Sequence, residues 1–265
     1  MPLHTSSLLF LVGGGRSPRY PPNKVILWDD ALEQEVAELE FRERVRGLAC
    51  RKGWLAVALR RRVVVFELGT TVSRYGEWDT CDNPRGAFDY PMHPCRVPSF
   101  QLYPFHFDDS RAISHPFIRL GLLAMATAAY STLLAIPGRQ MGHVHLIHLP
   151  PCAPLEPLGP PASATPKPPL RPAKHPVSMF IAHESALTTL TVPPSGNLVA
   201  TSSSRGTLIR IWDSTTGKRV REFRRGTDKA EIYGVAFRPD EREVCVWSDK
   251  GTIHVFALAD DTGSS

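Results

Sequence analysis

Two stretches in the C-terminal part of the chain repeat one pattern about 45 residues apart. Residues 203–212 read SSRGTLIRIW, and residues 248–256 read SDKGTIHVF. Residues at the start of the pattern are 45 positions apart (203 and 248), and those at its end are 44 positions apart (212 and 256). The earlier copy thus has one additional residue, as if one residue bulged there. A period near 45 with four short strands per unit is typical of β-propeller blades. The repeat therefore predicts an all-β propeller built from four-stranded antiparallel blades.

The rest of the chain carries short strand patterns of the same kind. Runs rich in β-branched residues, such as Val63 to Phe66, alternate with turns at intervals of about 8 to 12 residues, which is an all-β signature. Looser copies of the repeated strand end at Trp28, Phe66 and Ile147. With the two clear copies, they predict five blade-like units.

Two stretches interrupt this pattern. Residues 91–120 show neither a strand nor a helix period and have the character of an insertion or an anomalous stretch. Residues 150–176 are so rich in proline that ladder hydrogen bonding is prevented, which predicts an extended surface loop. We therefore divide the chain into N-terminal blades at 1–149, a proline-rich loop at 150–176, further blades at 177–258 and a polar tail at 259–265.

The composition is that of a globular chain with a modest basic excess. Hydrophobic residues make up 42% of the 265 residues, and the net charge of +5 is too small to indicate nucleic acid by itself. Five scattered cysteines favour a reducing compartment over a disulfide framework. The N-terminus lacks a signal-peptide pattern, and the most apolar stretch, 120–136, is marginal for a membrane span. We expect a cytosolic protein whose membrane contacts are peripheral.

Between the two repeat copies lies the hexapeptide EFRRGT, at residues 222–227. Neighbouring residues on an extended strand point to opposite sides, so Arg224 and Arg225 can serve two different pockets. Phosphate is the natural partner of an arginine, whose planar fork offers paired donors to its oxygens. The alternative is a solvated or salt-bridged pair, for which Glu222 and Asp228 are close enough in sequence.

The repeat also brings similar side chains before and after the arginine pair. Thr207 and Arg210 precede it, and Thr252 and His254 follow it. We expect the fourth strand of one blade to run beside the first strand of the next, which would create two similar pockets with Ser-x-x-Gly turns whose amides approach phosphate oxygens. The alternative is that the threonines cap turns and the other two residues face solvent.

Several motifs, in order along the chain, resemble one known family. They are Leu11-Val-Gly-Gly-Gly15, Pro21-Pro-Asn-Lys-Val25 with Trp28-Asp-Asp30, Asn83-Pro-Arg-Gly86, Leu133 to Gly138 with Gly142-His-Val144, Ala182-His183, Gly206 to Arg210, and Phe223-Arg-Arg-Gly226. The chain resembles the PROPPINs, the WIPI-type phosphoinositide-binding WD-repeat propellers of autophagy. The resemblance covers about residues 8–90 and 128–258.

The resemblance implies two headgroup sites for phosphatidylinositol 3-phosphate or phosphatidylinositol 3,5-bisphosphate. The first site would use His183, Thr201, Ser203, Gly206, Thr207, Arg210 and Arg224. The second would use Arg225, Ser248, Thr252 and His254. It further implies no cofactor, an autophagy lipid-transfer protein as partner, and a cytoplasmic protein that is peripheral on phagophore, endosomal or vacuolar membranes.

The chain also departs from the family pattern. The resemblance implies seven blades, whereas the sequence pattern shows about five, beginning inside the second and stopping in the sixth. The apolar part of a loop that inserts into the bilayer in the family does not follow Asp260. With the patternless residues 91–120, this predicts a truncated or misassembled gene product with nearly complete lipid pockets.

Other function classes find less support in the sequence. Nucleophile-elbow, zinc-protease and dinucleotide-binding motifs are absent, so we expect no enzymatic activity. His143 and His145 share a strand face but lack a third metal ligand at a suitable spacing. Basic residues do not form a stripe interleaved with aromatics, as a nucleic-acid surface would. A protein-interaction propeller without lipid binding remains the alternative function.

Overall fold

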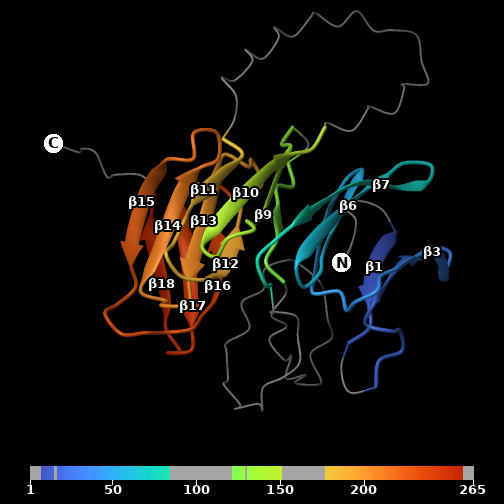
Figure 1. Ribbon diagram of the computed structural model, residues 1–265, viewed down its shortest axis with the longest axis horizontal. Helices are drawn as coiled ribbons and strands as arrows, with labels where there is room; N and C mark the ends of the chain where they lie inside the picture. Colours follow the sequence, from blue (N-terminus) through green and yellow to red (C-terminus); the bar gives the residue numbers. More distant parts are fainter. Residues whose placement is uncertain (1–6, 15–16, 84–120, 129, 151–176, 259–265) are drawn as a thin grey trace, which may run out of the picture.

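The computed structural model describes residues 7–14, 17–83, 121–128, 130–150 and 177–258 (Figure 1). The anomalous stretch 91–120, nearly all of the proline-rich loop 150–176 and the polar tail 259–265 lie outside the described residues. So do Pro84, Arg85 and Gly86 of one family-like motif, together with Cys95 and Cys152.

The described strands form five antiparallel sheets, here named A to E in chain order. Sheet A contains β1 (Leu8–Val12), β2 (Lys24–Asp29) and β3 (Gln34–Glu40). Sheet B contains β4 (Gly47–Arg51), β5 (Trp54–Ala58), β6 (Arg62–Leu68) and β7 (Val72–Asp79). Sheet C contains β8 (Ala124–Met125), β9 (Leu133–Pro137), β10 (His143–His148) and β11 (Met179–Ile181). Sheet D contains β12 (Leu187–Thr191), β13 (Leu198–Ser203), β14 (Leu208–Asp213) and β15 (Arg219–Arg224), and sheet E contains β16 (Ile232–Phe237), β17 (Glu243–Ser248) and β18 (Ile253–Ala257).

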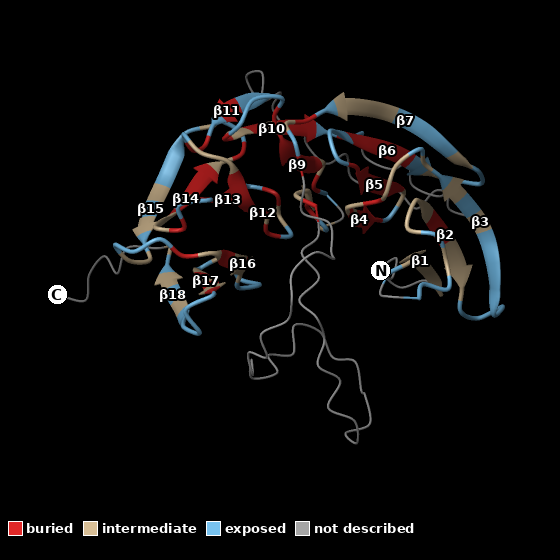
Figure 2. Cartoon of the chain, turned by 60° about the horizontal axis from the view of Figure 1, so that its bottom comes forward, coloured by how far each residue is buried: buried red, intermediate tan, exposed pale blue. Residues whose placement is uncertain are grey.

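The sheets follow one another along an arc, and their faces pack against each other (Figure 2). One buried cluster lies between each successive pair: Phe10 with Leu55 between A and B, and Trp54 with Leu134 between B and C. Clusters with the same role fill the spaces between C and D and between D and E. Each strand alternates its side chains between two faces, so a middle sheet contributes to the core on both sides.

The outermost strand of each sheet is the least buried or among the least buried. All five residues of β5 are buried, whereas the outer strands β3 and β15 have mostly exposed or half-buried residues (Figure 2). The β-branched and small residues of the inner strands suit a pleated surface covered on both faces. The charged residues of β15 are therefore presented at the outer edge of the arc.

The predicted all-β architecture with five blade-like units is confirmed by these five sheets. We expected the fourth strand of one blade to run beside the first strand of the next, and this prediction was wrong. The first strand of sheet E, β16, lies against β12 and β13 of sheet D, because the inner strands of adjacent blades converge at the centre of the arc. The outer strands β15 and β18 are linked by side chains, through Phe223 stacked on Phe256 with ring centroids 4.7 Å apart.

The one additional residue in the earlier copy of the repeat lies in the turn between two strands. The last pairs of the two hairpins are Ser202 with Ile209 and Trp247 with Ile253. Six residues, 203–208, separate the first pair and five residues, 248–252, separate the second. The expected strand bulge was therefore wrong, since a turn takes an extra residue without disturbing the ladder.

The proline-rich segment connects two neighbouring strands of one sheet. β11 follows this segment in the chain and pairs antiparallel with β10, which precedes it, at Val144 with Phe180. Two further strands are not predicted by the sequence pattern, namely β7, which is mostly exposed, and the two-residue β8.

Candidate functional site

The two adjacent arginines lie at the end of β15, on opposite faces of sheet D. The backbone N–H of Arg225 continues the strand ladder to the carbonyl oxygen of Thr207 at 2.9 Å. Because alternate residues share a face, Arg224 lies with Glu222, and Arg225 lies with Phe223. Phe223 packs on sheet E, so the face with Arg224 is the one turned toward sheet C.

Arg210 and Glu222 are cross-strand partners on the face toward sheet C. The Nε of Arg210 donates to Oε2 of Glu222 at 2.7 Å, and its Nη1 donates to the carbonyl oxygen of Ala182 at 2.7 Å. Arg219 donates to the same Oε2 at 2.6 Å. The hydrogen bond from Arg210 lowers the pKa of the Glu222 carboxyl, which stays ionised at neutral pH.

Arg224 differs from its neighbours on this face. Its side chain is exposed, and no hydrogen bond or ion pair engages its guanidinium group within the described part of the chain. An unengaged guanidinium at the rim of a sheet keeps all of its donors for an incoming anion.

Two of the predicted site residues, His183 and Thr201, lie inside the interface between sheets C and D. His183 is 4% exposed and Thr201 is fully buried. His183 Nε2 lies 3.0 Å from Thr201 Oγ1, which also accepts the indole N–H of Trp212 at 3.0 Å. Burial, with the positive charge of Arg210 as a second cause, lowers the pKa of His183 to about 4. A neutral imidazole in a buried hydrogen-bond chain holds the two sheets together.

The turn that precedes β14 is built around Gly206. The backbone of Gly206 has φ +66°, and a Cβ there would come within 1.7 Å of the carbonyl oxygen of Ala230. Its N–H donates to the carbonyl of Ser203, which is buried, at 2.8 Å. Glycine permits this conformation and this close approach. The loop that follows Arg225 is thereby seated on the turn.

Arg225 is fastened to that turn and loop. Its Nε donates to the carbonyl oxygen of Gly206 at 2.8 Å, and its Nη2 donates to the carbonyl oxygen of Asp228 at 2.7 Å. These bonds leave part of the guanidinium fork available and fix its orientation.

The remaining predicted residues belong to sheet E. Ser248 is buried, with its Oγ 3.4 Å from the amide nitrogen of Lys250. Thr252 Oγ1 lies 3.2 Å from His254 Nε2, and the His254 ring is parallel to Phe256. His254 therefore faces sheet D, as Arg225 faces sheet E. Within the described residues, no hydrogen bond joins Arg225 to the three predicted side chains of sheet E.

The alternative for the two arginines was a solvated or salt-bridged pair, and the exposed side chain of Arg224 is open to solvent. Neither Arg224 nor Arg225 forms an ion pair among the described residues, and Asp228 contributes its carbonyl oxygen in place of its carboxylate. Glu222 pairs instead with Arg210 and Arg219. The i,i+3 spacing of Arg219 and Glu222 is visible in the sequence, but the pairing with Arg210 requires the strand register.

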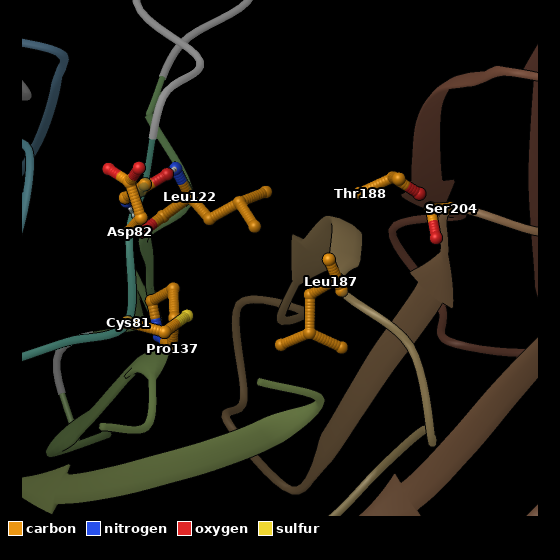
Figure 3. A pocket seen from close by; sticks show the side chains of 9 residues that line it. Cys81, Asp82, Leu122, Pro137, Leu187, Thr188 and Ser204 are labelled. Atoms are coloured by element: carbon orange, nitrogen blue, oxygen red, sulfur yellow. Dashed lines mark hydrogen bonds between the residues drawn. The ribbon is translucent and has the colours of Figure 1, made fainter. Parts of the chain in front are cut away.

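A separate cavity of about 170 Å³ lies between the connection from sheet B and the start of β12 (Figure 3). Cys81, Leu122, Pro137 and Leu187 supply most of its apolar lining. None of the predicted phosphoinositide residues lines this cavity. Within the described residues, no group of three potential metal ligands occurs, and no helix is long and apolar enough to cross a bilayer.

Comparison with known proteins connects this site to a family. The family model described as PROPPIN matches residues 173–265, a range that contains every predicted site residue. SVP1-like protein 2 of Schizosaccharomyces pombe is 30% identical over 256 residues, which cover 97% of this chain and 55% of that protein. SVP1-like protein 2 of Emericella nidulans is also 30% identical, with 97% and 61% covered. The chain thus spans a little over half the length of these relatives.

Solved structures share the fold. The crystal structure of Kluyvelomyces marxianus Hsv2 superposes with a TM-score of 0.66 at 20% identity, covering 98% of this chain and 62% of that one. A complex of KlAtg21 with the coiled coil of AgAtg16 superposes with a TM-score of 0.65 at 16% identity, covering 97% and 65%. The family-model match to residues 173–265 and the similarity to SVP1-like proteins along nearly the whole chain support a PROPPIN-family chain, and the solved structures share its fold.

Proposed function

We propose that this chain is a non-enzymatic effector that binds the phosphorylated headgroups of phosphatidylinositol 3-phosphate and phosphatidylinositol 3,5-bisphosphate. The first pocket lies on the face of sheet D toward sheet C and has Arg224 as its headgroup ligand, with Arg210 beside it. The second lies between sheets D and E and has Arg225, Thr252 and His254 around it. The buried His183, Thr201, Ser203 and Ser248, with Gly206 and Thr207, hold the turns and strands that carry these ligands.

The observation that carries this proposal is the state of Arg224. Its side chain is exposed on an outer strand with no protein acceptor among the described residues, whereas Arg210 and Arg219 on the same face are both engaged by Glu222. An arginine fork with free donors beside other cations suits a phosphomonoester. The PROPPIN family is known for phosphoinositide binding in autophagy, and the match to its model spans this region.

Two pockets on one rim favour a membrane over a soluble headgroup. Each proposed pocket offers only a few cationic side chains, so we expect the binding of a single headgroup to be weak. Simultaneous binding to two lipids in one bilayer adds avidity. We accordingly propose a cytoplasmic protein that is peripheral on phagophore, endosomal or vacuolar membranes.

A protein partner is compatible with the same role. One structural neighbour is described as a complex with the coiled coil of Atg16. By analogy, outer strands away from the arginine pair are available for a partner such as an autophagy lipid-transfer protein. The alternative function, an interaction scaffold without lipid binding, predicts that the arginines are dispensable for membrane recruitment.

Liposome flotation with and without phosphatidylinositol 3-phosphate tests the proposal. The full chain is compared with Arg224→Thr and with the double variant Arg224→Thr/Arg225→Thr. We expect the native chain to float only with the phosphoinositide, the single variant to bind severalfold more weakly, and the double variant to remain in solution.

The matched control is Arg238→Thr/Arg242→Thr. It removes the same two charges from the turn between β16 and β17, at the opposite end of sheet E. Retained flotation of this control separates headgroup pockets from diffuse charge attraction. If the native chain and the Arg224→Thr/Arg225→Thr variant float equally while both are folded, the lipid proposal is wrong.

A further inference from the structure

We propose that Glu222 is an intramolecular occupant of the first pocket, a carboxylate that holds the anion position until a phosphomonoester displaces it. This inference rests on the proposed function and assigns to Glu222 control over how strongly that pocket binds anionic lipids.

The hydrogen bonds around Glu222 have the form of an anion site. A single oxygen, Oε2, accepts from Arg210 at 2.7 Å and from Arg219 at 2.6 Å. The third arginine of this face, Arg224, lies two residues further along β15 and has no protein acceptor within the described residues. Three arginines therefore lie on the face of sheet D that holds this carboxylate, and two of them donate hydrogen bonds to it.

Arg210 does not depend on Glu222 for its orientation. Its Nη1 donates to the carbonyl oxygen of Ala182 at 2.7 Å, and Ala182 lies in the segment that directly follows β11. Only 22% of the Arg210 side chain is exposed. When Glu222 turns away, the guanidinium stays anchored on one edge and presents its freed Nε–H to the pocket.

The Glu222 carboxylate can leave its two arginine partners at a small cost in free energy. Its side chain is 34% exposed on an outer strand, and its partner Arg219 is 48% exposed, so both return to water when the contact breaks. Exposed ion pairs contribute little net stability. A phosphomonoester, with close to two negative charges and three acceptor oxygens, replaces the single carboxylate charge with a gain in charge-assisted hydrogen bonds.

Lipids differ in what they gain when they take the place of Glu222. A phosphodiester headgroup carries one negative charge on its phosphate, the same charge as the carboxylate that it would have to displace, so it gains little over Glu222. A headgroup with a phosphomonoester gains an extra charge. Glu222 thus lowers the affinity of the pocket for all anionic lipids by a common factor, and this factor takes the weaker ligands, those without a phosphomonoester, below measurable binding.

The test compares the native chain with Glu222→Gln, an isosteric variant without the charge. Two vesicle types are used, one with phosphatidylinositol 3-phosphate and one with phosphatidylserine as the only anionic lipid. We expect the variant to bind the phosphoinositide vesicles roughly fivefold more tightly, the effect of removing one exposed competing charge. We also expect it to gain measurable binding to the phosphatidylserine vesicles.

Asp228→Asn is the matched control, because it removes one carboxylate six residues away that has no arginine partner among the described residues. A diffuse field effect would raise the affinity of both variants equally. A displacement effect raises it mainly in Glu222→Gln. In a background with Arg210→Gln, the gain from Glu222→Gln should shrink, since the freed donor is no longer there.

Equal or weaker binding of a folded Glu222→Gln variant, alongside normal binding of the native chain, would overturn this inference and leave the proposed function intact. Glu222 would then be a residue that positions the arginines. Failure of both folded proteins to bind phosphoinositide vesicles would instead overturn the proposed function, and this inference with it.

Discussion

Arg224 and Arg225 are neighbours in sequence, but their side chains are held very differently. Arg225 donates to two backbone carbonyls, those of Gly206 and Asp228, and Arg224 donates to no protein atom within the described residues. We expect Arg225→Thr to lower the free energy of unfolding by about 1 kcal/mol, because the part-buried carbonyl of Gly206 and the exposed carbonyl of Asp228 lose their donor. Arg224→Thr should change it by less than about 0.5 kcal/mol.

Urea unfolding of the two single variants measures this difference. Equal stabilities would mean that the bonds of Arg225 are not maintained in solution. The comparison also guides the flotation experiment, since lost binding in Arg224→Thr is then a loss of ligand contact and not of structure.

His183 gives the chain a pH dependence with a defined direction. Its folded-state pKa is about 4, below the ordinary value of 6.5, so between these values the unfolded chain takes up a proton that the folded chain does not. Stability is therefore unaffected above about pH 6.5 and falls as the pH is lowered toward 4, by at most roughly 3 kcal/mol. His183→Gln removes this part of the dependence.

The measurement is the free energy of unfolding of both proteins between pH 7 and 4.5. We expect the variant to be less stable at pH 7 and the gap to narrow as the pH falls. The other two histidines whose pKa is lowered, His145 and His148, are common to both proteins and cancel in the difference. If the difference in the free energy of unfolding between the two proteins does not change with pH, the lowered pKa of His183 is contradicted.

At the residue scale, strand alternation is sufficient to assign Arg224 and Arg225 to opposite faces. It does not reveal that His183 and Thr201 lie inside an interface, because a strand with two covered faces has no exposed side to mark its polar residues. The pairing of Arg210 with Glu222 also depends on register, which a one-residue bulge in β15 shifts at Trp212.

At the scale of elements, the two repeated hairpins offer a matched pair of glycines. Gly206 and Gly251 have nearly the same backbone, with φ of +66° and +69°, but a Cβ on Gly206 would meet a carbonyl at 1.7 Å, whereas Gly251 faces open space. We expect Gly251→Ala to cost about 1–2 kcal/mol from the left-handed conformation alone. Gly206→Ala should cost about 3 kcal/mol or more, because the loop over it must also move.

Thermal or urea unfolding of the two variants distinguishes these costs. Equal destabilisation would show that the loop carrying Arg225 is not seated on the turn. Gly206→Ala should in addition weaken phosphoinositide binding, since the carbonyl that orients Arg225 is displaced with the turn.

The elements that the sequence predicts well are those that repeat. Third strands such as β14 and β18 carry the 44–45-residue pattern, and their glycine turns are visible as Ser-x-x-Gly. The outer strand β7 and the short β8 are not predicted, because the first is mostly exposed and the second makes only two ladder pairs. Their formation depends on the edge offered by the strand beside them.

At the scale of the whole molecule, the copies of the repeated strand predict five blade-like units, but the spatial arrangement of the five sheets follows from packing. Each described core cluster joins only adjacent sheets, with inner strands converging and outer strands apart (Figure 2). The sequence does not distinguish contact through inner strands from contact between fourth and first strands, because both bury the same apolar residues. The pockets that we propose beside Arg224 and Arg225 consequently depend on the packing between sheets.

Because each described sheet packs only on its neighbours, the loss of one packing contact is expected to destabilise particular sheets. Phe256 of β18 stacks on Phe223 of β15, next to the proposed second pocket. In an array where each unit contacts only its neighbours, a lost contact destabilises the two sheets that share it and leaves distant ones unchanged. We expect Phe256→Ala to raise amide hydrogen exchange in sheets E and D, with sheets A and B as in the native chain. Phe10→Ala, in the cluster between A and B, is the mirror-image control and should raise exchange there alone. Exchange that rises uniformly in either variant would mean that all five sheets unfold as one cooperative unit, and the second pocket would then share the stability of the entire arc.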